Sequence, residues 1–207
     1  MKFEPGSFHI GVIDLFSVIL PGAVVAYLVY LGREAVPIKG LIPVPEDEVE
    51  KWIFLAFASY FLGHLLFLAG SFLDDTLYDP VRKLIWRKSK DQAFCVADAI
   101  RREYITNDAA GEAVNTFQWA KARIMLQHPE AIHEVHRLEA DSKFFRSLVV
   151  LLLVITIVSF AQQKWDGGIV FSATLLLSFW RYVEQRFKST KRAYQLVITL
   201  ENLPPQP

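Results

Sequence analysis

The stretch Trp52–Pro80, WIFLAFASYFLGHLLFLAGSFLDDTLYDP, decides the fold that we predict for this chain. Between residues 52 and 73 it holds no charged side chain, apart from His64 when that imidazole is protonated. At about 1.5 Å per residue this helix measures about 33 Å, enough to cross a hydrocarbon core of about 30 Å. It then meets residues that we expect to end it, namely Asp74, Asp75, Asp79 and Pro80. We therefore predict a membrane-spanning helix with a central histidine and an acidic exit.

Three further apolar segments extend this prediction to four transmembrane helices. The first, at about residues 11–31, carries Pro21 in its middle and lacks the small-residue cleavage site of a signal peptide. A third apolar segment starts at Phe144, and a fourth follows a very short turn at 163–168. The chain is therefore predicted to cross the membrane four times, as two hairpins.

The fold class that follows is an all-α integral membrane protein with a polar insert between its second and third spans. The insert shows apolar residues at the three- and four-residue spacing of amphipathic helices. After residue 193 the pattern fits a strand or a continued helix equally well. The predicted parts are a first hairpin at 1–73 with helices at about 11–31 and 52–73, a cytoplasmic helical block at 74–145, a second hairpin at 146–187 and a cytoplasmic tail at 188–207.

The distribution of positive charge predicts the orientation. The net charge is +0, with 22 basic and 22 acidic residues, so direct nucleic-acid binding is not expected. All but four of the basic residues fall at the N-terminus, in the polar block or on the C-terminal side; the four are Arg33, Lys39, Lys51 and Lys164. Because retained lysine and arginine mark the cytoplasmic side, both termini and the block are predicted to be cytoplasmic. Size and simplicity alone favour a bacterial inner membrane.

Small residues predict where the helices pack closely in lipid. The first two predicted spans are rich in glycine, alanine and serine, whereas the third is almost entirely large and branched. Small side chains let two helix backbones approach each other. We expect close contacts, within the chain or with another copy, at Gly22, Ala26, Ser59, Gly63 and Gly70.

Two ionisable residues lie inside the predicted spans. Asp14 is near the start of the first span and His64 is in the middle of the second. Such residues are functional candidates because they are expensive to place at membrane depth. In antiparallel packing their depths differ by about 9 Å, so we do not expect a direct pair. Asp14 also suits a helix start, and a neutral His64 suits a hydrogen bond to a neighbouring hydroxyl or carbonyl.

A basic run follows the second span directly. Such clusters usually set topology and touch anionic lipid, and a bound nucleotide is the sharper alternative. The candidate contacts are Arg82, Lys83, Arg87, Lys88, Lys90, Arg101 and Arg102.

No cofactor or metal site is expected. The only cysteine, Cys95, has no CxxC spacing, and the histidines of the block do not converge as zinc ligands do. No catalytic residues are assigned, because no nucleophile motif such as G-x-S-x-G is present.

The leading hypothesis is a non-enzymatic polytopic membrane protein that associates with itself. Its cytoplasmic block would sense a ligand or a partner protein, and its membrane helices would respond by changing their packing or permeability. A stress or phage-defence effector is one version of this hypothesis.

Two alternatives come from other classes of protein. A small channel or transporter would use Asp14, Pro21 and His64. A membrane-surface enzyme acting on lipid would hold a metal with Asp74, Asp75 and Asp79, since clustered carboxylates suit hard divalent cations.

Overall fold

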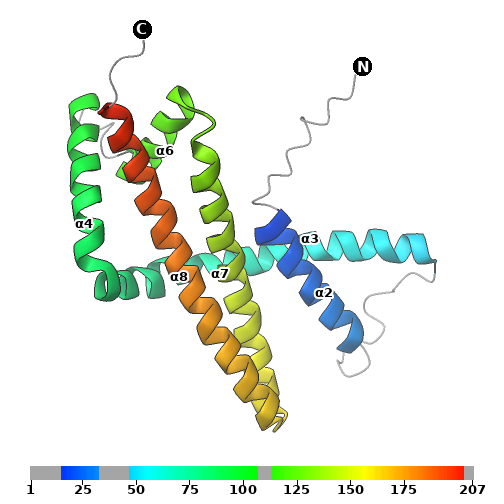
Figure 1. Cartoon of the computed structure of the whole chain (residues 1–207). Helices are drawn as coiled ribbons and strands as arrows, with labels where there is room; N and C mark the ends of the chain where they lie inside the picture. The colour runs from blue at the N-terminus through cyan, green and yellow to red at the C-terminus, as the bar shows by residue number, and fades with distance from the viewer. Residues whose placement is uncertain (1–14, 33–46, 107–112, 203–207) are drawn as a thin grey trace, which may run out of the picture. The chain divides into compact units, whose positions relative to one another are not determined.

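The computed structural model describes residues 15–32, 47–106 and 113–202, and every regular element within these ranges is a helix (Figure 1). No strand occurs in the described residues, in agreement with the predicted all-α class. In chain order the elements are the π-helical turn η2 (Leu15–Ile19), α2 (Leu20–Gly32), α3 (Glu48–Leu73), the π-helical turn η3 (Asp74–Tyr78), α4 (Asp79–Tyr104), α6 (Thr116–Gln127), α7 (Ile132–Ala161) and α8 (Trp165–Glu201).

The chain divides into two compact units. Unit 1 comprises Met1–Thr76 and Ala140–Tyr182, and unit 2 comprises Leu77–Glu139 and Val183–Pro207. The long helices α7 and α8 each contribute residues to both units. This division departs from the predicted one, in which the second hairpin and the C-terminal tail were separate parts.

Helix α3 begins four residues before its predicted start because Asp47 caps it. The Asp47 carboxylate accepts hydrogen bonds from the backbone N–H groups of Val49 (2.8 Å) and Glu50 (3.2 Å). Acidic residues in this first turn also interact favourably with the positive end of the helix dipole. A polar turn therefore precedes the apolar part of α3.

The prediction that this helix ends at Pro80 is wrong. Pro80 lies in the first turn of α4, directly after the π-helical turn η3. The turn η3 joins α3 to α4, and Glu48–Arg82 form one helical run of 35 residues. The helical run therefore continues through the proline that was expected to stop it.

Pro21 interrupts the first apolar helix, and a neighbouring helix compensates for it. Because proline has no N–H, Pro21 cannot donate a hydrogen bond to the carbonyl of Ser17, four residues earlier. The Ser147 hydroxyl of α7 donates a hydrogen bond to that carbonyl at 3.1 Å. Both Ser17 and Pro21 are fully buried. This is the kind of repair that makes proline tolerable in a helix surrounded by lipid.

The turn between α7 and α8 is shorter than predicted. The N–H of Lys164 donates to the carbonyl of Ser159 (2.9 Å), and the N–H of Gln163 donates to that of Phe160 (3.0 Å). These are the two bonds of a Schellman motif, and Gln163 adopts the left-handed conformation that it requires, with φ 59°. Because this motif stops α7 within one turn, α8 can begin at Trp165.

Unit 2 has a hydrophobic core of its own. It is formed by α4, α6, the start of α7 and the end of α8, and its buried members are Ala97, Trp119, Ala120, Ile124, Ile132, Val135, Ala193, Tyr194 and Val197. The last three come from the segment that was predicted as a separate tail. Of the two conformations left open for that segment, the structure has the helix, which continues to Glu201.

Two helices are long and apolar enough to cross a membrane. They are Glu48–Arg82, whose most apolar 18 residues have a mean hydropathy of 1.9, and Ile132–Ala161, whose most apolar 18 residues have a mean hydropathy of 2.5. Within the described residues Ser17–Tyr30 is also apolar but shorter. The apolar part of α8 is bounded by Asp166 and Arg181, which leaves too short a run for the same criterion. The four-span topology therefore stays a prediction.

Candidate functional site

The predicted small residues of α2 and α3 lie where the two helices touch. A Cβ atom added to Gly22 would lie 1.8 Å from the Ser59 carbonyl oxygen and 2.6 Å from the Gly63 nitrogen. A Cβ atom on Gly63 would lie 2.1 Å from the carbonyl oxygen of Val18. The two backbones are therefore in direct contact, and no larger residue fits at either glycine without a shift. The Ser59 hydroxyl donates back to the Leu55 carbonyl, so it adds no unpaired polar group.

Two further small residues complete this set. Ala26 is 5% exposed on α2, and Gly70 is buried on α3. A Cβ atom on Gly70 would lie 3.2 Å from the Cγ and Nε atoms of Arg146. Gly70 thus leaves room for the arginine from α7 rather than for a helix backbone. All five predicted packing residues are thus buried within the part of the chain that the structure describes.

Arg146 is the centre of a buried polar cluster in unit 1. Its side chain is 7% exposed, and its Nη1 atom donates to the Asp74 carboxylate at 2.5 Å. The Tyr182 hydroxyl from α8 donates to the other oxygen of the same carboxylate. One carboxylate therefore joins η3, α7 and α8. We call these three residues the Asp74 cluster.

The surroundings of the Asp74 cluster hold the arginine in place. The guanidinium carbon of Arg146 lies 4.5 Å from the centroid of the Phe67 ring, which is cation–π geometry. The Nε atom of Arg146 is buried without a hydrogen-bond partner among the described residues. A buried charge is costly unless it is paired, so the Asp74 carboxylate is the group that makes Arg146 tolerable here.

The two members of the predicted carboxylate triad whose side chains the structure describes have different partners. Asp74 bonds to Arg146 and Tyr182, whereas Asp79 lies 3.4 Å from Arg82 as an ion pair within unit 2. The side chain of Asp75 lies outside the described residues. Among the described residues no group of three or more histidine, cysteine, aspartate or glutamate side chains could hold a metal ion.

The two intramembrane candidates have different outcomes. Asp14 lies outside the described residues. His64 is exposed on α3, and its ring meets that of Tyr60 edge-on, with 4.5 Å between centroids. His64 therefore points away from the small-residue contact with α2 and not toward a neighbouring carbonyl within the described part of unit 1.

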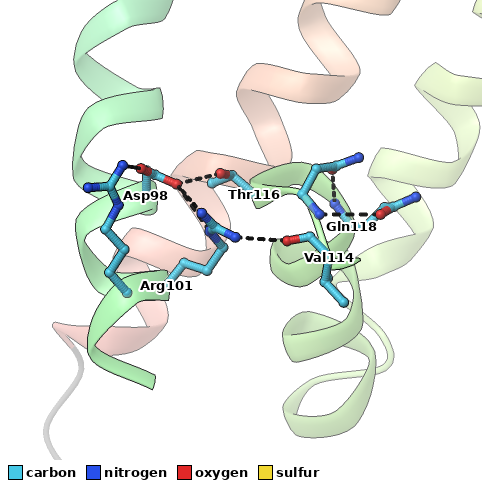
Figure 2. A network of polar contacts seen from close by, with 7 residues as sticks. Asp98, Arg101, Val114, Thr116 and Gln118 are labelled. Carbon is cyan, nitrogen blue, oxygen red and sulfur yellow. Dashed lines mark hydrogen bonds and ion pairs between the residues drawn. The ribbon is translucent and has the colours of Figure 1, made fainter. Parts of the chain in front are cut away.

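Three of the predicted basic contacts, Arg82, Arg101 and Arg102, pair with carboxylates inside unit 2. Figure 2 shows Asp98 of α4 facing Arg101 and Thr116, with Arg101 reaching on to the Val114 carbonyl. Arg102 also pairs with Asp98, at 2.9 Å. Arg101 is thus a structural link between α4 and the start of α6. The other candidates are Arg82, which pairs with Asp79, and Lys83, Arg87, Lys88 and Lys90, whose side chains lie outside the described residues.

The start of α6 explains why this link is well defined. Asn115 caps the helix by accepting from the N–H of Gln118 (2.9 Å), and the Gln118 side chain accepts from the N–H of Asn115. This reciprocal capping box orients the first turn, which carries Thr116. The Thr116 hydroxyl then donates to Asp98 at 2.7 Å.

The neighbours of Asp98 stabilise its ionised form. Burial raises the pKa of the Asp98 carboxyl, but hydrogen bonds from Thr116 and Arg101 and the charges of Arg101 and Arg102 lower it by more. The pKa of Asp98 therefore lies below its ordinary value. The carboxylate stays ionised at neutral pH, as a link between two arginines and a threonine requires.

A shallow hollow lies along α6 in unit 2. Trp119, Ala122, Arg123, Leu126 and Gln127 line it, and its volume is about 210 Å³. Arg123 stacks 3.8 Å above the Tyr104 ring and pairs with the Glu201 carboxylate at 2.5 Å. Pockets for small organic ligands are usually larger, about 300–1,000 Å³. The hollow therefore does not indicate a ligand.

The Asp74 cluster was not predicted, although its residues carried a signal. Arg146 stands at the entrance of one apolar segment and Asp74 at the exit of another, both on the predicted cytoplasmic side. Opposite charges at the same depth are candidates for pairing. Asp98 and Thr116 gave no such signal, because nothing in a single sequence indicates that they meet.

The chain matches no protein-family model, no curated protein and no solved structure. Its function is therefore proposed from the contacts, burial and charges of the described residues.

Proposed function

We propose that this chain is a non-enzymatic, multi-pass membrane protein in which unit 1 lies in the bilayer and unit 2 lies on the cytoplasmic side. In this proposal unit 2 senses a ligand or a partner protein, and the helices of unit 1 respond by changing their packing or permeability. A bacterial stress or defence effector is one form that such a protein takes. The observation that carries the membrane placement is the exposed apolar surface of unit 1.

That surface is made of large side chains on α3, α7 and α8. On α3 eight of them are each more than half exposed, namely Val49, Trp52, Ile53, Phe57, Tyr60, Phe61, Leu68 and Phe72. On α7 and α8 the exposed set includes Leu153, Val154, Ile157, Ile169, Val170, Leu176 and Leu177. A soluble protein rarely leaves so large an apolar area in water, whereas hydrocarbon solvates it readily.

The long apolar helices fit a membrane span better than they fit the core helix of a soluble protein or a signal sequence. A core helix of a soluble protein is mostly buried, but only 17% of the apolar window in Glu48–Arg82 and 33% of that in Ile132–Ala161 are buried. A signal sequence lies near the N-terminus, whereas these helices begin at residues 48 and 132. Aromatic residues at the start of α3 and α8, Trp52 and Trp165, also suit the membrane interface.

The Asp74 cluster supports a mechanical link rather than chemistry. Its three side chains bond to one another, and the carboxylate uses both oxygens in doing so. Asp74 and Tyr182 also lie within a few residues of points where the chain passes from unit 1 to unit 2. A change in unit 2 would therefore reach unit 1 through helices that this cluster ties together.

The native cysteine offers a direct test of placement and orientation. Cys95 is exposed on α4 in unit 2, and the chain has no other cysteine. In intact bacterial cells a membrane-impermeant maleimide should not label Cys95, and it should do so after the membrane is opened. The same membranes washed at alkaline pH should retain the protein.

A matched variant supplies the control. In the Cys95→Ser background, Lys164→Cys puts a single thiol in the exposed turn between α7 and α8. It should be labelled in intact cells, because the proposed topology places that turn on the opposite side of the membrane. Extraction by alkaline washing would refute the membrane placement, and labelling of Cys95 in intact cells would refute the orientation.

A further inference from the structure

His64 and Tyr60 form a polar patch in the middle of the exposed apolar face of α3. Tyr60 is 52% exposed, His64 is also exposed, and their rings meet edge-on. Within the described residues neither ring nitrogen of His64 has a hydrogen bond. The patch lies about eight residues or more from either polar end of the helix, which is about 12 Å at 1.5 Å per residue.

In a bilayer this position calls for a protein partner. Water is scarce at that depth, and a polar side chain facing hydrocarbon lacks the hydrogen bonds that it would make in water. A short imidazole cannot reach the interface as a lysine side chain can. In membranes such polar side chains usually form hydrogen bonds with a neighbouring helix.

The spacing on α3 indicates a helix as that partner. Phe57, Tyr60, His64 and Ser71 recur at intervals of three, four and seven residues, which is the repeat of a left-handed helix–helix seam. The remaining position of this repeat is Phe67, whose ring packs against Arg146 of the same chain. This seam is separate from the small-residue face, which is used against α2. At about 100° per residue, His64 lies about 100° around the helix from Gly63.

We infer that the Tyr60–His64 face of α3 is a dimer interface that takes α3 of a second copy of this chain. Copies inserted with the same topology pair in parallel about an axis along the membrane normal, so equal positions meet at equal depth. A neutral imidazole carries one donor and one acceptor, so His64 can hydrogen-bond to its own equivalent. A tyrosine hydroxyl has the same property. The face is therefore complementary to itself, and the partner that fits it is a second copy of this chain.

This inference rests on the proposed membrane placement and deepens the proposed self-association. It also moves the interface away from the glycine and serine residues that the sequence indicated. A polar residue within such a seam fixes register and oligomer number, so His64 would select a dimer in one alignment.

Disulfide trapping in native membranes tests the geometry. In the Cys95→Ser background, His64→Cys should form a disulfide-linked dimer when a mild copper oxidant is added at low expression. Leu65→Cys is the matched control, because it has nearly the same depth and is exposed but points about 100° away. It should stay monomeric under the same conditions.

Substitution of His64 tests the hydrogen bond. His64→Leu should raise the dimer dissociation constant in mild detergent by about 3- to 20-fold, the usual range for one interhelical hydrogen bond. His64→Asn should restore much of the affinity, since an amide can also pair with itself. The side chain is exposed, so both variants should keep the helix content and thermal midpoint of the native chain.

The results separate this inference from the proposed function. Equal trapping of the two cysteine variants, a monomeric native chain, or a dimer unaffected by His64→Leu would overturn the interface. Any of these outcomes with the protein still retained in washed membranes would leave the membrane placement standing. Loss of the protein from those membranes would overturn both.

Discussion

Gly63 shows what a single residue decides in this protein. Its missing Cβ lets the Val18 carbonyl approach, and an added Cβ would lie 2.1 Å from that oxygen. The neighbour is backbone and cannot rotate away as a side chain could. Gly63 thus permits a backbone contact between two helices, although glycine is a poor helix former.

We predict that Gly63→Ala separates α2 from α3. The added methyl group overpacks the contact, which typically costs about 1–3 kcal/mol. Thermal unfolding in detergent should show a lower midpoint, by about 2–4 °C for each kcal/mol in a chain of this size.

Gly167→Ala is the control for this prediction. Gly167 is also helical, but a Cβ there meets only Phe171, at 3.9 Å, which is ordinary contact. Alanine should be neutral or raise the midpoint, because it is the better helix former. Equal effects of the two substitutions would argue against the backbone contact.

At the scale of elements, unit 2 depends on the link from Asp98 to α6. The Asp98 carboxylate accepts a hydrogen bond from Thr116 and forms ion pairs with Arg101 and Arg102. Asp98 itself is only 8% exposed. Removing it would leave Arg101 and Thr116 with fewer partners in a buried site. Such losses typically cost about 1–3 kcal/mol.

The low pKa of Asp98 predicts a pH dependence of stability. A carboxyl whose pKa is lower in the folded state stabilises the fold fully above its unfolded pKa of about 3.9. That contribution is lost as the pH falls through the lower folded pKa. Between about pH 5 and pH 3 the thermal midpoint should therefore fall less steeply in Asp98→Asn than in the native chain.

Circular dichroism in detergent checks this expectation. Asp98→Asn should also have the lower midpoint at neutral pH, since an amide cannot pair with the arginines as an anion does. Asp166→Asn serves as the comparison, because Asp166 is an exposed acidic residue in the first turn of α8. If Asp98→Asn keeps the native slope, the carboxylate does not carry the effect.

At the scale of the whole molecule, the Asp74 cluster joins parts of the chain that are far apart in sequence. Residues 74, 146 and 182 come from η3, α7 and α8. Arg146 is the more buried of the two charged residues, and breaking a buried pair from one side usually costs about 3–5 kcal/mol. Replacing both partners by apolar residues of similar size usually costs much less.

We therefore predict strong coupling between Asp74 and Arg146. Asp74→Leu alone should lower the unfolding midpoint more than the double variant Asp74→Leu/Arg146→Met, because the single change leaves a buried cation. The exposed pair of Lys188 with Glu184 is the control, and Lys188→Met should change stability by less than about 0.5 kcal/mol. Additive effects at Asp74 and Arg146 would contradict the pairing.

Much of this protein was determined by its sequence alone. Apolar length and helical periodicity predicted the all-α class and the long apolar helices, because both depend on residues close together in the chain. The small residues of α2 and α3 were identified for the same reason. The sequence also drew attention to His64, since a polar residue in an apolar run is visible without any structure.

Only the tertiary structure decided which faces meet. In the folded chain Gly22 and Gly63 lie against each other, and Arg146 and Tyr182 both bond to Asp74. The end of α8 forms part of the core of unit 2. The helical run also continues through Pro80. The physical reason is that propensity and hydrophobicity act along the chain, whereas pairing depends on side chains brought together from distant positions.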